Sequence, residues 1–173
     1  IFDIIDNLKP SWRNELEITD ALDNLLKENN NISFEKITDY WKDTGTPEDI
    51  LHANGEIIKK CCEEFLSDEG SDSMGIIYGE GTIIENNSLK IKGPVIIGKN
   101  CHISSGSIGP NVSVGDNTTI SISSIKNSII MKNCKINSAA EIQNSIIANN
   151  SEIKDETGNK KIFLLGEGSK ISL

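Results

Sequence analysis

An aliphatic residue recurs every five or six positions through the second half of the chain. The steps are 6, 6, 5, 6, 6, 5, 5, 6, 6, 5 and 6 residues, and the positions are Ile91, Ile97, Ile103, Ile108, Val114, Ile120, Ile125, Ile130, Ile136, Ile142, Ile147 and Ile153. This period is neither helical nor that of a plain strand. It is typical of a solenoid with three short parallel strands per coil, each directing one aliphatic side chain inward before a tight corner. The pattern therefore predicts columns of stacked isoleucine.

Small and polar residues follow many of these aliphatic positions. Glycine and asparagine suit corners that need φ near zero or positive. The residues expected there are Gly98, Gly109, Gly115, Asn100, Asn111 and Asn117. The repeat is less regular at both ends. Steps of seven join Ile77, Ile84 and Ile91, which predicts an irregular first coil, and Gly158-Asn159-Lys160-Lys161 interrupts the pattern before Leu165 and Ile171 resume it as a terminal cap.

Composition supports a narrow aliphatic core and a division into two parts. The 173 residues include 30 isoleucines, and the aromatic share is only 5%. Residues 1–72 carry a net charge of −11, whereas residues 73–173 carry +2. A polar run from Ser67 to Ser73 spans the junction of the two parts and indicates a solvated linker. We therefore predict two domains, 1–72 and 73–173.

The sequence also argues against several classes of protein. No apolar run approaches the length of a membrane span, and the first residues lack the basic region of a signal peptide. The formal net charge of −9 argues against nucleic-acid binding. The spacing of Cys61, Cys62, Cys101 and Cys134 fits neither a zinc site nor a disulfide framework. We expect four buried free thiols and a cytoplasmic protein with no membrane or nucleic-acid partner.

The first half predicts helices around a short strand. Thr19 is a plausible N-cap for a helix that carries Leu22, Leu25 and Leu26 at helical spacing and stops in Glu28-Asn29-Asn30-Asn31. Ile32, Phe34 and Ile37 then fit a short strand.

A second helix of about twenty residues should follow the capping pattern Thr46-Pro47-Glu48-Asp49. Its expected buried stripe is Ile50, Asn54, Ile57, Ile58, Cys61 and Phe65. These elements are too few to close a core, so the first half is expected to belong to a larger domain.

Two residues of the first half are candidates for phosphate chemistry. Arg13 is the single arginine of the chain, and its guanidinium presents a planar fork of donors that matches a phosphate. The structural alternative is a surface salt bridge to Glu15 or Glu17. Asp43, expected at a strand end just before the second helix, could hold Mg²⁺ beside substrate phosphates. Its alternative is to stabilise its own turn.

Longer motifs carry a family resemblance. The repeat resembles the hexapeptide left-handed parallel β-helix, and the left hand is implied by that resemblance. The stretches PSWRNELEITD and YWKDTGTPEDILHAN resemble the sugar-1-phosphate nucleotidyltransferases, most closely glucose-1-phosphate thymidylyltransferases of the long form. The implied fold is mixed: a small α+β remnant of a nucleotidyltransferase domain over 1–72, followed by a left-handed β-helix over 73–173.

The resemblance also implies an activity and site residues. In this family a sugar-1-phosphate oxygen attacks the α-phosphorus of a nucleoside triphosphate, usually dTTP, and pyrophosphate leaves. Arg13 would contact the phosphate of the sugar phosphate, and Asp43 would bind Mg²⁺ together with a second carboxylate. The family usually has glycine where this chain has Asn14. Because asparagine tolerates positive φ, we expect the turn to be kept.

The family's glycine-rich phosphate loop and its second metal carboxylate have no counterpart in this sequence. We therefore expect an inactive C-terminal fragment of a glucose-1-phosphate thymidylyltransferase, with a β-helix that is structural and forms a homo-oligomer. The alternative is a hexapeptide-repeat acyltransferase that uses acetyl-CoA on a sugar or sugar nucleotide. His102 would then be the general base, whereas His52 is expected on the surface.

Overall fold

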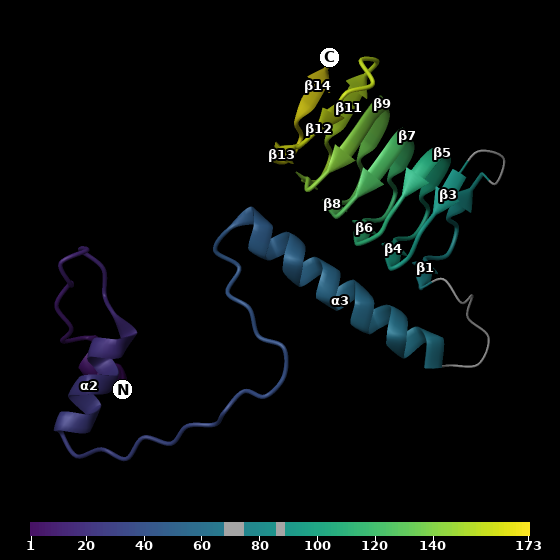
Figure 1. The fold of residues 1–173 in the computed structure, drawn as a ribbon. Coiled ribbons are helices and arrows are strands. Elements are labelled where there is room, and N and C mark those ends of the chain that lie inside the picture. The colour runs from purple at the N-terminus through teal and green to yellow at the C-terminus, as the bar shows by residue number, and fades with distance from the viewer. Residues whose placement is uncertain (68–74, 86–88) are drawn as a thin grey trace. The chain divides into compact units, whose positions relative to one another are not determined.

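A computed structural model describes residues 1–67, 75–85 and 89–173, without the side chains of residues 65–67. The chain divides into two compact units, residues 1–41 and 42–173 (Figure 1). Each unit is described by itself because their relative positions are not determined. The domain boundary predicted at residues 72 and 73 lies outside the described residues.

The first unit is helical and has very little core. Its helices are α1 (Phe2–Ile5) and α2 (Ile18–Lys27), which contact each other. Among residues 1–41, Ala21 alone is buried. The predicted N-cap is wrong, because α2 begins after Glu17 rather than after Thr19. The predicted stop is confirmed, since α2 ends at Lys27 and Asn29 adopts a φ of 55°.

The short strand predicted over Ile32, Phe34 and Ile37 does not form. These residues have no regular secondary structure, and all three side chains are exposed. A strand needs a neighbouring strand to pair its backbone groups, and residues 1–41 contain none. The small α+β part expected at the start of the chain is therefore a helical part.

The predicted second helix is α3 (Pro47–Ser67), with 21 residues. Its capping pattern is confirmed. The Thr46 hydroxyl accepts a hydrogen bond from the Asp49 backbone N–H at 3.2 Å and donates one to Asp49 Oδ2 at 2.7 Å. Lys42 Nζ lies 2.8 Å from the same carboxylate. These contacts fix the first turn of α3 and the residues just before it.

The buried stripe of α3 includes Ile58, as predicted, but differs at other positions, and the Phe65 side chain lies outside the described residues. Leu51, Ile58 and Cys62 are buried, whereas Ile50 and Ile57 are exposed, with 58% exposure for Ile57. Helix α3 packs against β1, β4, β6 and β8, and the Ser113 hydroxyl donates to Asn54 Oδ1 at 2.8 Å. The solenoid covers one side of α3, so the buried positions are Leu51 and the residues seven and eleven further along, with Asn54 on the same side.

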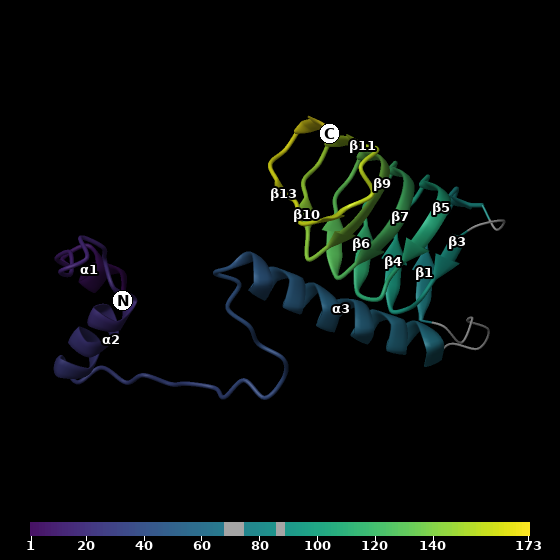
Figure 2. The ribbon, with the colours of Figure 1, turned by 45° about the horizontal axis from the view of Figure 1, so that its top comes forward.

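The second unit is a parallel β-solenoid with α3 along one side (Figure 2). One sheet has the order β1-β4-β6-β8-β10-β13 and a second has the order β14-β11-β9-β7-β5-β2, with β3 paired to β5 and β12 paired to β9. The strands are β1 (Ile76–Tyr78), β2 (Ile83–Ile84), β3 (Leu89–Ile91), β4 (Val95–Ile97), β5 (His102–Ile108), β6 (Val112–Val114), β7 (Thr119–Lys126), β8 (Ser128–Ile130), β9 (Lys135–Gln143), β10 (Ile146–Ile147), β11 (Glu152–Asp155), β12 (Lys160–Lys161), β13 (Leu164–Leu165) and β14 (Lys170–Ser172). The predicted parallel solenoid is confirmed.

The predicted aliphatic columns are also confirmed. One column stacks Ile84, Ile103, Ile120, Ile136, Ile153 and Ile171, and the other two contain the remaining aliphatic positions of the repeat. From Ile97 to Ile153 every one of these side chains is almost fully buried. The columns are the hydrophobic core of the second unit.

The corners use asparagine as the sequence predicts. Positive φ values of 53–60° occur at Asn100, Asn111, Asn117, Asn133 and Asn150. The amides also pair from coil to coil. Asn117 Nδ2 donates to Asn133 Oδ1, and Asn133 Nδ2 donates to Asn150 Oδ1 at 3.1 Å. The corners are therefore held by side-chain ladders as well as by backbone pairing.

Two of the predicted corner glycines serve another purpose. Gly98 and Gly115 do not have positive φ, unlike Gly109. A Cβ on Gly98 would lie 2.7 Å from Asp116 N, and one on Gly115 would lie 2.7 Å from Lys132 N. Glycine is needed at both positions because the next coil approaches too closely for a side chain.

The first coil has a different register from the one predicted. Tyr78, rather than Ile77, pairs with Ile97 in the column, and Ile77 pairs with Ile96 on the outer face. The step from Tyr78 to Ile84 is therefore six residues. Tyr78 is exposed because the column ends there.

The last coil contains an ion pair with a buried carboxylate where the aliphatic pattern stops. Lys161 takes the column position beside Ile142, and its Nζ lies 3.0 Å from Asp155 Oδ2. Asp155 is only 2% exposed. The Thr157 hydroxyl and backbone N–H donate to Asp155 Oδ1 at 2.7 and 2.8 Å. Beyond this pair, Leu165 and Ile171 resume the columns as predicted.

All four cysteines are free thiols, but only three are buried. Cys61 is half-buried, which corrects the prediction for that residue, because it lies beside the face of α3 that contacts the solenoid. Burial raises the pKa of the Cys62 and Cys134 thiols.

Within the described ranges, no helix combines the length and apolar character needed to cross a membrane.

The buried Asp155 predicts a loss of stability in acid. Its Thr157 and Lys161 partners lower its pKa from 3.8 to about 2. Its stabilising contribution is therefore complete above about pH 4 and is lost as the pH falls through about 2. The unfolding midpoint measured by circular dichroism should fall across this window, and less steeply in Asp155→Asn. Glu156→Gln, which changes a neighbouring exposed carboxylate, should keep the parental pH dependence, and an unchanged slope in Asp155→Asn would contradict the assignment.

Candidate functional site

Arg13 lies on a tight turn just before α2. The Ser11 backbone N–H donates to Glu15 O at 2.8 Å, and the Asn14 N–H donates to Ser11 O at 2.9 Å. Asn14 has a φ of 61°. The turn expected at Asn14, with a positive φ, is therefore present in the backbone.

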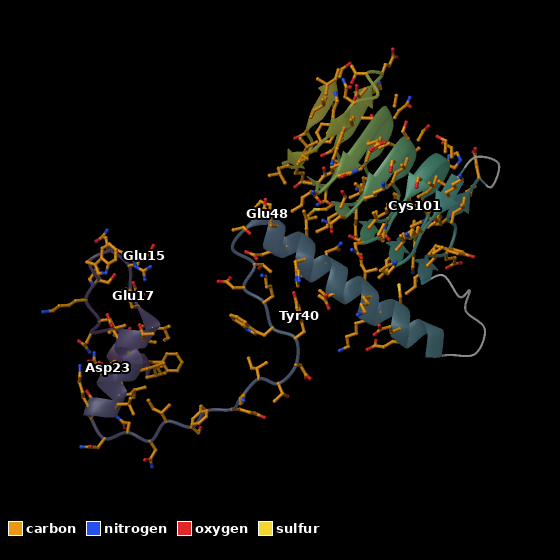
Figure 3. The ribbon with its side chains drawn as sticks, in the orientation of Figure 1. Glu15, Glu17, Asp23, Tyr40, Glu48 and Cys101 are labelled. Atoms are coloured by element: carbon orange, nitrogen blue, oxygen red, sulfur yellow. The ribbon has the colours of Figure 1, made fainter. Side chains whose placement is uncertain are left out.

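The guanidinium of Arg13 is held by Glu17. Arg13 Nε and Nη2 donate to Glu17 Oε1 at 3.2 and 2.8 Å, and the Ser11 hydroxyl donates to the same oxygen at 3.0 Å. The hydrogen bonds from Arg13 and then Ser11 lower the pKa of Glu17. The sequence predicted a salt bridge to Glu15 or Glu17 as the structural alternative for Arg13, and the structure contains the one to Glu17. Figure 3 labels Glu15 and Glu17 on the segment that leads into α2.

This salt bridge leaves one end of the guanidinium open. Within residues 1–41, the hydrogen bonds of Arg13 side-chain nitrogens use Nε and Nη2, and Nη1 carries none. The side chain is 54% exposed. Its guanidinium carbon lies 5.8 Å from the centroid of the exposed Trp12 ring. Arg13 therefore presents free N–H donors to a ligand while the Glu17 contact restricts its orientation.

Asp43 is exposed and lies in the irregular segment before α3. It does not stand at a strand end, because residues 31–45 contain no strand. It precedes the Thr46 cap, and its neighbour Lys42 pairs with Asp49 at the start of the helix. The chain direction at Asp43 is thus set by the contacts of Lys42 and Thr46 with Asp49.

The described residues do not form a complete metal site. No group of three His, Cys, Asp or Glu side chains gathers anywhere in the ranges 1–67, 75–85 and 89–173. Mg²⁺ in phosphate-handling sites commonly takes one or two carboxylates, with waters and phosphate oxygens as its other ligands. Asp43 fits one such carboxylate, and a second would have to come from elsewhere.

Arg13 and Asp43 belong to different units, and the prediction that they share one site stays a prediction.

The two histidines are both exposed. His52 lies on α3 as expected. His102, the general base of the acyltransferase alternative, lies on β5 with its Nε2 2.7 Å from Glu85 Oε1.

The sequence did not predict a groove beside α3 in the second unit. It has a volume of about 550 Å³. One side is the first half of α3, including Glu48, Leu51 and His52, and the other includes Ile162, Leu164 and a row of corner asparagines. Figure 3 labels Glu48 at the beginning of this helix. No single motif signals the groove, since its two sides come from elements that lie far apart in the sequence.

The solenoid sequence matches a known family model. Residues 79–172, more than half of the chain, match the model described as "GMPPB C-terminal domain". The chain belongs to the GMPPB C-terminal domain family. Residues 1–60 match a second model, described as "Nucleotidyl transferase". This matched segment includes both Arg13 and Asp43. These matches confirm the predicted combination of a nucleotidyltransferase segment and a solenoid.

Curated relatives agree with this family assignment. The chain is 34% identical over 118 residues to "Glucose-1-phosphate thymidylyltransferase" from Streptomyces griseus, covering 65% of this chain and 32% of the relative. It is 41% identical over 83 residues to "Low-salt glycan biosynthesis nucleotidyltransferase Agl11" from Haloferax volcanii, covering 48% and 21%. It is 41% identical over 92 residues to "Bifunctional protein GlmU" from Methanococcus aeolicus, covering 53% and 21%.

This member of the GMPPB C-terminal domain family spans about a third or less of the length of these curated relatives. A comparison with solved structures gave no match. The relatives confirm the resemblance to sugar-1-phosphate nucleotidyltransferases that the motifs around Arg13 and Asp43 predict.

Proposed function

We propose that the chain is the C-terminal part of a glucose-1-phosphate thymidylyltransferase, which converts dTTP and glucose-1-phosphate into dTDP-glucose and pyrophosphate. One observation carries this proposal. The segment that matches the nucleotidyl transferase model contains a turn that presents an arginine with a free guanidinium end. The name of the Streptomyces griseus relative supports glucose-1-phosphate as the sugar substrate.

In this proposal Arg13 binds the phosphate of the sugar phosphate. The reaction needs two negatively charged phosphates to approach each other in line, so charge neutralisation and alignment matter most. A guanidinium neutralises charge and fixes direction, because its N–H groups form a planar fork. Exposure of Arg13 on a short turn gives a phosphate access to that fork.

Asp43 has a second role in the proposal, as one carboxylate ligand of Mg²⁺. When bound, the ion would neutralise phosphate charge. Its other protein carboxylate and the nucleotide-binding loop would come from the remainder of the enzyme. The solenoid is proposed to be structural, and its assembly into a homo-oligomer stays a prediction.

The whole activity is tested by measuring pyrophosphate release from dTTP and glucose-1-phosphate. The 173-residue chain alone should give no product above background, because it contains no glycine-rich phosphate loop. A longer protein that continues upstream of Ile1 should be active. A normal enzymatic rate from the chain alone would contradict the fragment proposal, and a longer protein inactive with both substrates would contradict the proposed reaction.

Replacing Arg13 in the longer enzyme should impair use of the sugar phosphate. In Arg13→Ala, the KM for glucose-1-phosphate should rise by roughly 10- to 100-fold, because a charge-assisted hydrogen bond to phosphate is lost. The KM for dTTP should stay near the parental value. Arg13→Lys, which keeps the charge but loses the fork, should be intermediate. Equal increases for both substrates would show that the arginine acts only on the fold.

Asp43→Asn in the same enzyme should lower kcat and raise the Mg²⁺ concentration needed for half-maximal rate. The amide keeps the shape of the side chain but removes the charge that binds a hard cation. Asp39→Asn, a similar exposed carboxylate in the preceding residues, is the matched control and should behave like the parent. An Asp43 variant with parental kinetics and Mg²⁺ response would exclude the metal role.

A further inference from the structure

Glu17 occupies a particular position on the Arg13 guanidinium. A guanidinium has a side edge, formed by Nε–H and one N–H of Nη2, and an end formed by Nη1 and the second N–H of Nη2. Glu17 Oε1 accepts from Nε at 3.2 Å and from Nη2 at 2.8 Å, so it takes the side edge. The end with two parallel donors is left for a ligand, and no other described residue of the first unit hydrogen-bonds to it.

Ser11 links this pair to the backbone of the turn. Its hydroxyl oxygen accepts a hydrogen bond from the Arg13 backbone N–H at 3.2 Å, and the hydroxyl donates to Glu17 Oε1 at 3.0 Å. The Glu17 side chain is only 23% exposed, compared with 54% for Arg13. Glu17 is therefore the more enclosed and anchored partner, and Arg13 is the more accessible one.

We propose that Glu17 is a positioning residue for Arg13, which holds the side edge of the guanidinium so that its two-donor end is directed at the phosphate of the sugar substrate. This inference rests on the proposed function. A long arginine side chain samples many rotamers, and fixing it beforehand lowers the entropy lost when phosphate binds. Ser11 in turn orients the Glu17 carboxylate through its hydroxyl.

Charge alone predicts the opposite effect of removing Glu17. A carboxylate beside the phosphate site repels the substrate, so its loss should strengthen phosphate binding if only electrostatics mattered. Loss of positioning should weaken binding instead. The sign of the change therefore separates the two explanations. Glu17 precedes α2 but makes no side-chain capping hydrogen bond, so its replacement does not remove a helix cap.

The test uses steady-state kinetics of the longer enzyme. Glu17→Ala should raise the KM for glucose-1-phosphate about tenfold, in line with the cost of a misplaced binding group. The KM for dTTP should remain within about twofold of the parent, since the loss concerns one substrate. Glu17→Gln keeps an acceptor oxygen at the same reach and should restore a KM for glucose-1-phosphate close to the parental value.

Glu15→Ala is the matched control, since it removes the same charge from the same turn. No side-chain hydrogen bond of Glu15 occurs within the described part of the chain, and its backbone carbonyl would still accept from Ser11. Glu15→Ala should have parental kinetics. An equal rise in both KM values, a parental or lowered KM for glucose-1-phosphate in Glu17→Ala, or a Glu17→Gln variant as impaired as Glu17→Ala would overturn the inference.

Arg13→Ala in the same series distinguishes failure of the inference from failure of the proposed function. If Arg13→Ala raises the KM for glucose-1-phosphate and Glu17→Ala does not, the arginine binds phosphate without help from Glu17, and only the inference fails. If Arg13→Ala has no effect on that KM, the phosphate role of Arg13 fails, and the positioning role of Glu17 fails with it.

Discussion

Stacking of one coil on the next is the constraint on which the second unit depends. Parallel strands pair about 4.8 Å apart, so each side chain lies directly against its counterpart in the next coil. Isoleucine against isoleucine fills this spacing along the interior columns. The same spacing demands glycine at Gly98 and Gly115, where a Cβ would collide with the next backbone. It also places corner asparagines such as Asn117 and Asn133 within hydrogen-bonding distance.

This repetition explains why the solenoid could be predicted from sequence and the first unit could not. Each coil repeats the same spacing of aliphatic residues, so the twelve positions all indicate the same parallel solenoid. The prediction placed Ile77 in the column where the structure has Tyr78, and this error lies where the column ends and the pattern no longer repeats. In the first unit, by contrast, the stretch around Phe34 has the composition of a strand, but residues 1–41 contain no strand with which it could pair. Strand propensity describes fit to a sheet surface, and without that surface it has no consequence.

The sequence names candidate site residues but does not determine their geometry. A single arginine on a turn with a helix-forming segment behind it can be read from the sequence. Which of Glu15 and Glu17 binds it cannot, because both carboxylates lie within reach along the chain. The choice follows from the positive φ of Asn14 and from the Ser11 hydroxyl, which donates to the Glu17 carboxylate. The groove beside α3 had no local signal at all, since it depends on how two distant elements pack.

Helix α3 shows that sequence family and packing divide the chain differently. The nucleotidyl transferase match ends at residue 60, inside α3, and the solenoid match begins at residue 79. Yet Leu51 and Ile58, both within the first match, are buried against the solenoid, and Asn54 accepts a hydrogen bond from Ser113. The net charge changes near residue 72, whereas the packing changes after Trp41. The last helix of the nucleotidyl transferase segment is therefore supported by the solenoid, which gives the repeat a structural role.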